Sequence, residues 1–224
     1  MIPFYAEETV TVAGPVAKLP QKGSGSGGSR RPLNSFVIRR GEGAVLLDAA
    51  YSWALTGIAA EPSPQAIVFS HGDTVDSADA LDALAGRGAP FLLHPADGRE
   101  GPVAFEDPRG HPALGGIEVI GMPGHTPGSI CLWLAGEGIL LTGDAAVAPG
   151  PEQEAEPARL QVPIQADVAR AQADWRALVP RLGGLRVVAP LHGAIYRRDE
   201  MGEAAFDAAL AHLWEGEPMD PRSP

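Results

Sequence analysis

The stretch "PGHTPGSICLWLAGEGILLTGD", residues 123–144, combines two apolar runs with two side chains that can bind or catalyse. The runs "GSICLWLA" and "GILLTG" are rich in large apolar residues and are separated by a Gly-containing turn, so they predict two consecutive strands. His125 lies in a Gly- and Pro-rich turn before the first strand, and Asp144 follows the second strand directly. Asp is depleted from strands, so an Asp at this strand end indicates a binding or catalytic role at that edge of the sheet.

The same arrangement recurs at three other apolar runs. Asp48 follows "AVLL", His71 follows "IVFS" and His192 follows "VVAPL". In α/β sheets, ligand sites assemble at the C-terminal edge of the strands. We therefore expect the polar residues at these strand ends to form one site together with His125 and Asp144.

Imidazole and carboxylate groups are common ligands of zinc, iron and manganese. The chain has one cysteine, Cys131, and its histidine spacing does not match a zinc finger, which excludes a cysteine-rich structural site. The remaining class is an open, catalytic metal site that keeps a position for water and lowers the pKa of that water toward about 7. Cys131 itself lies in an apolar run and is expected to be a small buried residue rather than a reactive thiol.

The rest of the chain predicts alternating strands and helices. Further strands are expected at "TVTVAG", "NSFVIRR", "GAVLLDA", "QAIVFS", "PFLLH", "IEVI" and "RVVAP". Helices are expected over residues 76–85, 166–182 and 203–214, with Pro180 kinking or ending the second one early. The last helix should bury Phe206, Leu210, Leu213 and Trp214. Strands followed by helices in this order predict an α/β protein in which helices cover sheets.

Composition narrows the class of protein. A length of 224 residues suits one domain, residues 1–224, and contents of 45% hydrophobic and 20% charged residues are those of a globular chain. Seventeen basic against 28 acidic residues give a net charge of −11 without a basic stripe, which argues against nucleic acid as a partner. The start of the chain resembles no signal peptide and no apolar run approaches about 18 residues, so we expect a cytoplasmic protein without a membrane partner.

Two segments predict loops. The tract "QKGSGSGGSRRP" predicts a flexible loop at about residues 21–31. An engineered linker is the less favoured interpretation, because strand-like sequence continues on both sides. The acidic, Pro-rich segment "PGPEQEAEP", residues 149–157, predicts a second loop. Both loops are expected to shape access to the site.

Several motifs resemble those of one family. "PGHTPGSICLW", "LLTGD" and "APLHG" resemble the third, fourth and fifth motifs of the metallo-β-lactamase superfamily, which includes the glyoxalase II-like hydrolases. "NSFVI" and "GAVLLDAA" are similar to the opening strands of that family. The resemblance runs from about Asn34 to Tyr196. It implies an αββα sandwich with a one- or two-metal site between the edges of its sheets.

The chain departs from the family at the first metal motif, where "SHGDTVDS" replaces the pattern H-x-H-x-D-H. Aligned without gaps, Asp73 replaces the second histidine, Val75 the aspartate and Asp76 the last histidine. With two residues deleted, Asp73 matches the family aspartate and Thr74 replaces the last histidine. The gapped alignment is preferred because "ADAL" then falls in register. Both alignments keep His71 as the first histidine and lose at least one imidazole.

The resemblance implies a set of metal ligands and supporting residues. The candidate ligands are His71, Asp73, His125, Asp144 and His192. If Asp73 is not a ligand, it is the candidate general base. Asp48, Thr74 and Asp76 are expected to support the site without contacting metal, with an ordinary helix N-cap favoured for Asp76. One ion is expected rather than two, because the second site needs the altered Asp-His pair. Zinc is the first expectation, with iron or manganese as alternatives.

Two functional hypotheses follow. In the first, the chain is a metal-dependent hydrolase whose activated water attacks an ester, thioester, lactone or phosphoester of a small-molecule substrate. In the second, it is a pseudoenzyme of the same fold that binds little or no metal and acts as a binding or regulatory module. The hydrolase is preferred because five donor positions survive. Assembly into a homo-oligomer is left open.

Overall fold

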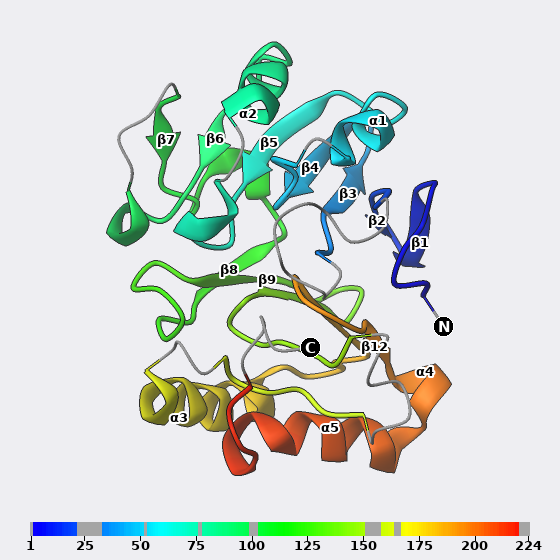
Figure 1. Cartoon of the computed structure of the whole chain (residues 1–224), viewed down its shortest axis with the longest axis vertical. Coiled ribbons are helices and arrows are strands. Elements are labelled where there is room, and N and C mark those ends of the chain that lie inside the picture. The colour runs from blue at the N-terminus through cyan, green and yellow to red at the C-terminus, as the bar shows by residue number, and fades with distance from the viewer. Residues whose placement is uncertain are drawn as a thin grey trace.

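The fold is a layered α/β arrangement, seen in a computed structural model that describes residues 2–21, 33–51, 53–75, 78–98, 103–150, 158–163 and 167–219. Two sheets pack face to face, and helices cover the outer face of each sheet (Figure 1). The order of layers is therefore helix, sheet, sheet, helix, as predicted. Apart from Gln21, the predicted Gly/Ser loop lies outside the described residues, and so does most of the predicted acidic loop.

The first sheet contains seven strands that are neighbours in chain order. They are β1 (Val10–Ala13), β2 (Val16–Lys18), β3 (Phe36–Arg40), β4 (Gly43–Leu47), β5 (Pro64–Val68), β6 (Phe91–Leu92) and β7 (Phe105–Glu106). Strands β1 to β4 pair antiparallel, and β4 to β7 pair parallel. Because β4, β5 and β6 run in the same direction, the residues that follow them meet at one edge of the sheet.

The second sheet has the strand order β12-β11-β10-β9-β8. Its strands are β8 (Glu118–Gly121), β9 (Ile130–Leu134), β10 (Ile139–Gly143), β11 (Val187–Pro190) and β12 (Tyr196–Arg197). β10 and β11 are parallel, and β9 lies antiparallel between β8 and β10. Strands β8, β10 and β11 therefore share a direction and end at the same edge.

Helices cover the two outer faces. α1 (Ala54–Ile58) and α2 (Ala78–Ala85) lie over the first sheet, and α3 (Val168–Leu178), α4 (Arg198–Met201) and α5 (Glu203–Glu215) lie over the second (Figure 1). Short 3-10 helices are η1 (Gly72–Thr74), η2 (Pro95–Asp97), η3 (Pro112–Leu114) and η5 (Val179–Arg181). Pro180 lies in η5, so α3 ends at Leu178 because proline lacks the amide that continues a helix. Among the described residues, no helix is both long and apolar enough to cross a membrane.

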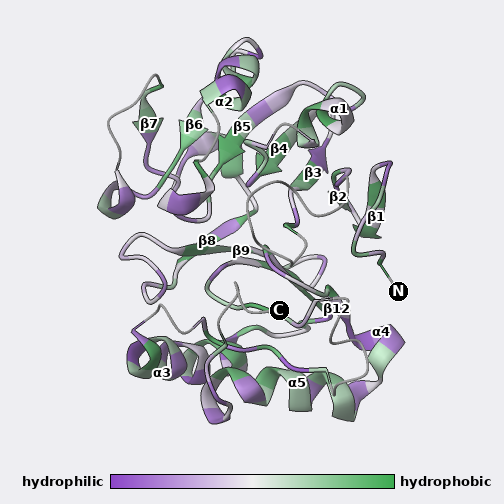
Figure 2. Cartoon of the chain, in the orientation of Figure 1, coloured by the Kyte–Doolittle hydropathy of each residue, from purple (hydrophilic) through white to green (hydrophobic). Residues whose placement is uncertain are grey.

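The apolar core is divided among three spaces: one between the sheets and one under each helical layer. All residues of β4, β9 and β10 are buried. These strands have both faces covered, which explains why their sequences are continuous apolar runs rather than alternating patterns. Figure 2 shows β4 and β9 as mainly hydrophobic, while hydrophilic residues lie on the outer helices.

One predicted core residue lies at the margin of the core. Trp214 is only half-buried, and its indole Nε1 donates to Glu215 Oε1 at 3.2 Å. Phe206, Leu210 and Leu213 of the same helix are buried as predicted. Trp214 packs against the edge of the cluster that these residues form, so the prediction that it is buried holds only in part.

Candidate metal centre

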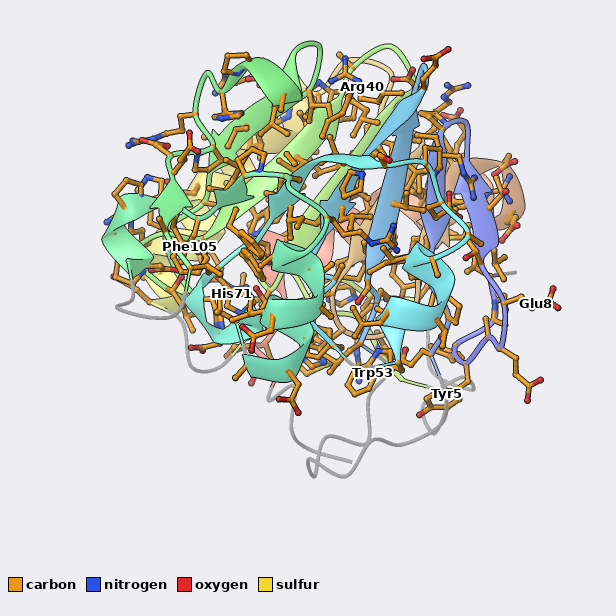
Figure 3. The ribbon with its side chains drawn as sticks, turned by 90° about the horizontal axis from the view of Figure 1, so that it is seen from above. Tyr5, Glu8, Arg40, Trp53, His71 and Phe105 are labelled. Carbon is orange, nitrogen blue, oxygen red and sulfur yellow. The ribbon has the colours of Figure 1, made fainter. Side chains whose placement is uncertain are left out.

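Four of the predicted residues meet at one end of the sandwich. His71 follows β5 of the first sheet, and His125, Asp144 and His192 follow β8, β10 and β11 of the second. Figure 3 shows His71 on the opposite side of the molecule from Arg40, the last residue of β3. The site therefore lies where strands from both sheets end, as expected for a ligand site in this class of fold.

The carboxylate of Asp144 lies at the centre of the cluster. Its Oδ2 is 3.5 Å from His192 Nε2, 3.6 Å from His71 Nε2 and 3.8 Å from His125 Nε2. The rings of His71 and His125 stand edge to face, with centroids 4.8 Å apart. The donor atoms of His71, His125 and Asp144 all lie within 4.8 Å of one another. His192 contacts Asp144 from outside this compact group.

This donor set fits a metal ion. In a tetrahedral zinc site, neighbouring ligand atoms lie about 3.3–3.5 Å apart, close to the separations around Asp144 Oδ2. Asp144 Oδ1 and His125 Nδ1 are buried and have no hydrogen-bond partner among the described residues. Because a buried carboxylate oxygen without a donor is costly, a cation is a suitable partner for it.

Burial shapes the electrostatics of the cluster. Burial raises the pKa of Asp144 to about 7, an effect opposed by His125 and reinforced by the charge of Asp73. Asp48 is also fully buried, which raises its pKa to about 7 despite the hydrogen bonds it accepts from Ser70. A cation beside Asp144 would favour its ionised form, because an opposite charge lowers the pKa of a carboxylic acid.

Asp48 lies behind His71 and supports it through Ser70. The backbone amide of Ser70 donates to Asp48 Oδ1 at 2.8 Å, and the Ser70 hydroxyl lies 2.9 Å from His71 Nδ1. If Nδ1 carries the ring proton and donates it to Ser70, the Nε2 lone pair is left to face the cluster. Among the described residues, Asp48 is the one non-glycine with a positive φ, 50°.

Of the altered residues after His71, Asp73 faces the cluster and Thr74 does not. Asp73 is 63% exposed, and its Oδ2 lies 3.7 Å from His125 Nε2, on the open side of the site. Thr74 is buried, and its hydroxyl donates to the carbonyl of His71 at 2.8 Å, so this side chain holds the η1 turn. Asp76 lies outside the described residues.

Three further residues that hold the site were not predicted from the sequence. Asn34 Nδ2 donates at 2.9 Å to the carbonyls of Pro190 and Gly193, which lie on both sides of His192. Trp175 Nε1 donates at 2.9 Å to the carbonyl of Ala145, next to Asp144. The third residue, Asp97, accepts hydrogen bonds from the loop that carries His71 and from the loop that carries His125. The local sequence around them carries no signal for these roles, because each contact joins distant parts of the chain.

Comparison with known proteins identifies the class. The family model described as the metallo-beta-lactamase superfamily matches residues 76–192, more than half of the chain. The chain belongs to the metallo-β-lactamase superfamily. The match begins directly after the stretch that contains His71 and Asp73. A comparison with curated proteins gives no match.

Solved structures agree with this assignment at the level of the fold. A metallo-beta-lactamase from Pontibacter korlensis is 19% identical, with a TM-score of 0.68 and coverage of 93% of this chain and 97% of that one. The mono-zinc form of FIM-1 from Pseudomonas aeruginosa is 18% identical, with a TM-score of 0.63 and coverage of 92% and 94%. A metallo beta lactamase from Erythrobacter litoralis is 20% identical, with a TM-score of 0.61 and coverage of 93% and 92%.

The predicted superfamily and the predicted αββα sandwich are thus confirmed. The narrower likeness to glyoxalase II-like hydrolases stays a prediction. Superfamily membership and the cluster of His71, His125 and Asp144 together support a metal-dependent hydrolase.

Proposed function

We propose that the protein is a metal-dependent hydrolase that cleaves an ester, thioester, lactone or phosphoester bond in a small-molecule substrate. The observation that carries this proposal is the position of Asp144 Oδ2, which lies 3.5–3.8 Å from three imidazole Nε2 atoms. Imidazole and carboxylate groups, shielded from most solvent, are the ligand types of a catalytic zinc site, in which three protein side chains bind the ion and a fourth position is left for water.

His71, His125 and Asp144 would hold the ion, with His192 and, on the open side, Asp73 as further candidate ligands. We propose one ion, because the altered motif leaves too few imidazoles for a second site. Zinc is the proposed metal, with iron or manganese as alternatives because carboxylates favour harder ions. When bound, such an ion lowers the pKa of a water toward about 7 and stabilises a developing oxyanion.

Asp73 is proposed as the general base if it does not bind the ion. Its carboxylate is largely exposed, and its Oδ2 faces His125 Nε2 from the open side. A carboxylate in that position can accept the proton of an attacking water at the edge of the cluster. The buried residues His71 and Asp144, together with the partly buried His192, would meanwhile keep the donor atoms oriented.

The test combines metal analysis with activity. The parent protein, purified without chelator, should hold about one equivalent of metal. Asp144→Asn and His125→Ala should lose both the metal and hydrolysis of a panel of esters, thioesters, lactones and phosphoesters. His111→Ala is a matched control, because His111 Nε2 also lies near a carboxylate, 3.3 Å from Glu106, but outside the cluster. Absence of metal in the parent, with equal activity in all variants, would contradict the proposal.

The altered first motif favours a second candidate function, a metal-free pseudoenzyme that serves as a binding or regulatory module. At least one imidazole of the family pattern is missing from the stretch "SHGDTVDS". In this case zinc or manganese should leave the melting temperature unchanged. If the protein instead has a hydrolase site, a free metal concentration of 100 times the dissociation constant would raise its free energy of unfolding by about 2.7 kcal/mol.

Location and partners are proposed from composition alone. The net charge of −11 and the absence of a basic stripe support a protein that does not bind nucleic acid. We propose a cytoplasmic protein with a small-molecule substrate and without a membrane partner. Localisation of a tagged full-length chain would test this.

A further inference from the structure

Asp97 connects the two histidine loops through one carboxylate. It is the last residue of η2, which follows β6. Its Oδ2 accepts from the backbone amide of Gly72 at 2.9 Å and from the hydroxyl of Thr126, and its Oδ1 accepts from the amide of Gly128 at 2.7 Å. Both carboxylate oxygens are therefore used, and every partner is a donor.

The partners of Asp97 are neighbours of proposed metal ligands. Gly72 directly follows His71, and Thr126 directly follows His125. The His71 loop leaves the first sheet after β5, whereas the His125 loop joins β8 and β9 of the second sheet. Asp97 thus ties together two loops from different sheets at the point where their imidazoles must meet.

The hydroxyl groups of the second loop are arranged to donate toward Asp97. The amide of Thr126 donates to Ser129 Oγ at 3.0 Å, and the two hydroxyl oxygens lie 2.8 Å apart. With Ser129 donating to Thr126, the Thr126 hydroxyl proton is free to point at Asp97. The chain of donors therefore ends on the carboxylate. An ionised carboxylate accepts hydrogen bonds and cannot donate one.

The backbone of the second loop also leaves space for Asp97. A Cβ at Gly128 would lie 2.6 Å from Asp97 Cγ, closer than real contacts allow. A side chain at position 128 would therefore push the carboxylate out of the loop. The absence of a side chain at Gly128 is a separate observation from the hydrogen bonds, and it indicates that the loop is shaped to receive this carboxylate.

We propose that Asp97 is a positioning residue of the metal centre, which holds His71 and His125 at the separation that a single ion requires. The inference rests on the proposed metal-dependent function. Charge-assisted hydrogen bonds are about twice as strong as neutral ones, so three of them can hold two loops in register. Residues that orient metal ligands in this way typically change metal affinity by about 10–100-fold when mutated.

The test uses the full-length chain with zinc as the probe, in competition with a chelator. Asp97→Ala should weaken zinc binding by about 10–100-fold. Asp97→Asn keeps one acceptor oxygen, which can still receive the Gly128 amide, so it should give a smaller loss. Cobalt substitution should show an altered absorption spectrum in Asp97→Ala, because the ligand geometry changes. Unchanged zinc affinity and an unchanged cobalt spectrum in Asp97→Ala would overturn the proposal.

Glu61→Gln is the matched control. Glu61 also makes a tertiary link, accepting from Arg39 Nε at 2.7 Å and from Arg39 Nη2 at 2.8 Å, but it lies outside the site. Its substitution should lower the melting temperature without changing zinc affinity. An equal loss of zinc affinity in Glu61→Gln would show that general destabilisation explains the effect, and would overturn the positioning role.

Amide exchange in the metal-free protein separates this inference from the proposed function. The amides of Gly72 and Gly128 should exchange faster in Asp97→Ala than in the parent and in Glu61→Gln. If the parent binds no zinc, the proposed function fails, and faster exchange at both glycines still supports the link that Asp97 makes. Unchanged exchange at both glycines overturns that link, whether or not zinc binds.

Discussion

Gly143 lies so close to Ser70 that a Cβ at position 143 would stand 2.2 Å from the Ser70 hydroxyl oxygen. Gly143 directly precedes Asp144, and Ser70 directly precedes His71. The approach of these two residues therefore sets how near the Asp144 carboxylate comes to the His71 imidazole. The amide of Ile130 strengthens the same junction by donating to the Ser70 carbonyl at 2.8 Å.

Substitution Gly143→Ala should damage the proposed metal centre. Gly143 has a φ of 52°, a conformation that alanine adopts at a cost, and its Cβ would also collide with Ser70. We expect a loss of about 1–3 kcal/mol in the free energy of unfolding and a zinc affinity at least about tenfold lower. Denaturant titration and chelator competition would measure the two effects.

Gly41→Ala is the control for backbone strain alone. Gly41 has a φ of 55°, and a Cβ at position 41 would meet no atom within 4 Å apart from its chain neighbours. This glycine lies at the end of the sheet away from His71. This variant should lose stability but keep the zinc affinity of the parent. Equal zinc affinities in Gly143→Ala and Gly41→Ala would contradict the idea that the Gly143–Ser70 approach sets the site.

The sequence predicted the residues at the strand ends but not those that support them. His71, Asp144 and His192 each follow a strong apolar run, and His125 lies in a Gly- and Pro-rich turn before such a run, so the strands and the polar residues beside them could be recognised together. Asn34 acts through carbonyls 156 and 159 positions away in the chain. No local pattern encodes such a contact, because it exists only once both sheets have formed.

The fold was predicted in the same uneven way. Strands β4, β9 and β10 were recognised because both of their faces are buried, which gives continuous apolar runs. Strands β7 and β12 contain two residues each, too few for any periodicity, and they were not predicted. Such short edge strands exist because a neighbouring strand offers them hydrogen bonds, which is information held elsewhere in the chain.

Substitution Asn34→Ala should loosen the loop that carries His192. Asn34 is fully buried, and its loss would leave the carbonyls of Pro190 and Gly193 without their donor. We expect a loss of roughly 2–4 kcal/mol in the free energy of unfolding, together with weaker zinc binding. Gln172→Ala provides the comparison, because Gln172 makes one such bond, to the Gly216 carbonyl, and has no contact with the loop that carries His192 among its hydrogen bonds. If both variants bind zinc equally, Asn34 has no role in placing His192.

Substitution Trp175→Phe should weaken the support of Asp144. It removes the indole donor to the Ala145 carbonyl and leaves that buried carbonyl unsatisfied. We expect a loss of about 1–3 kcal/mol in the free energy of unfolding. Trp214→Phe is the matched control, since Trp214 is half-buried and its indole bonds an exposed glutamate, so it should change stability by about 0.5 kcal/mol or less. Similar losses in the two variants would argue against a special role for the Trp175 indole.

Lys18 should give the unfolding free energy a distinctive pH dependence. The side chain is only 1% exposed, and its Nζ donates to the carbonyls of Pro3 and Phe4. Burial lowers the pKa of Lys18 from 10.5 to about 8. Between pH 8 and 10.5 the unfolded chain therefore binds more protons at this residue than the folded chain, so its contribution to stability rises with pH across that window and is flat below it.

Substitution Lys18→Met isolates this contribution, because methionine has a similar shape but does not titrate. Denaturant unfolding of both proteins from pH 7 to 10.5 gives the difference in unfolding free energy at each pH. The parent should gain stability relative to Lys18→Met as the pH rises above about 8, because neutral lysine still has two N–H groups for its two carbonyl partners. Other titrating groups are common to both proteins and cancel in the difference. A difference that stays constant over this range would show that Lys18 keeps its ordinary pKa when buried.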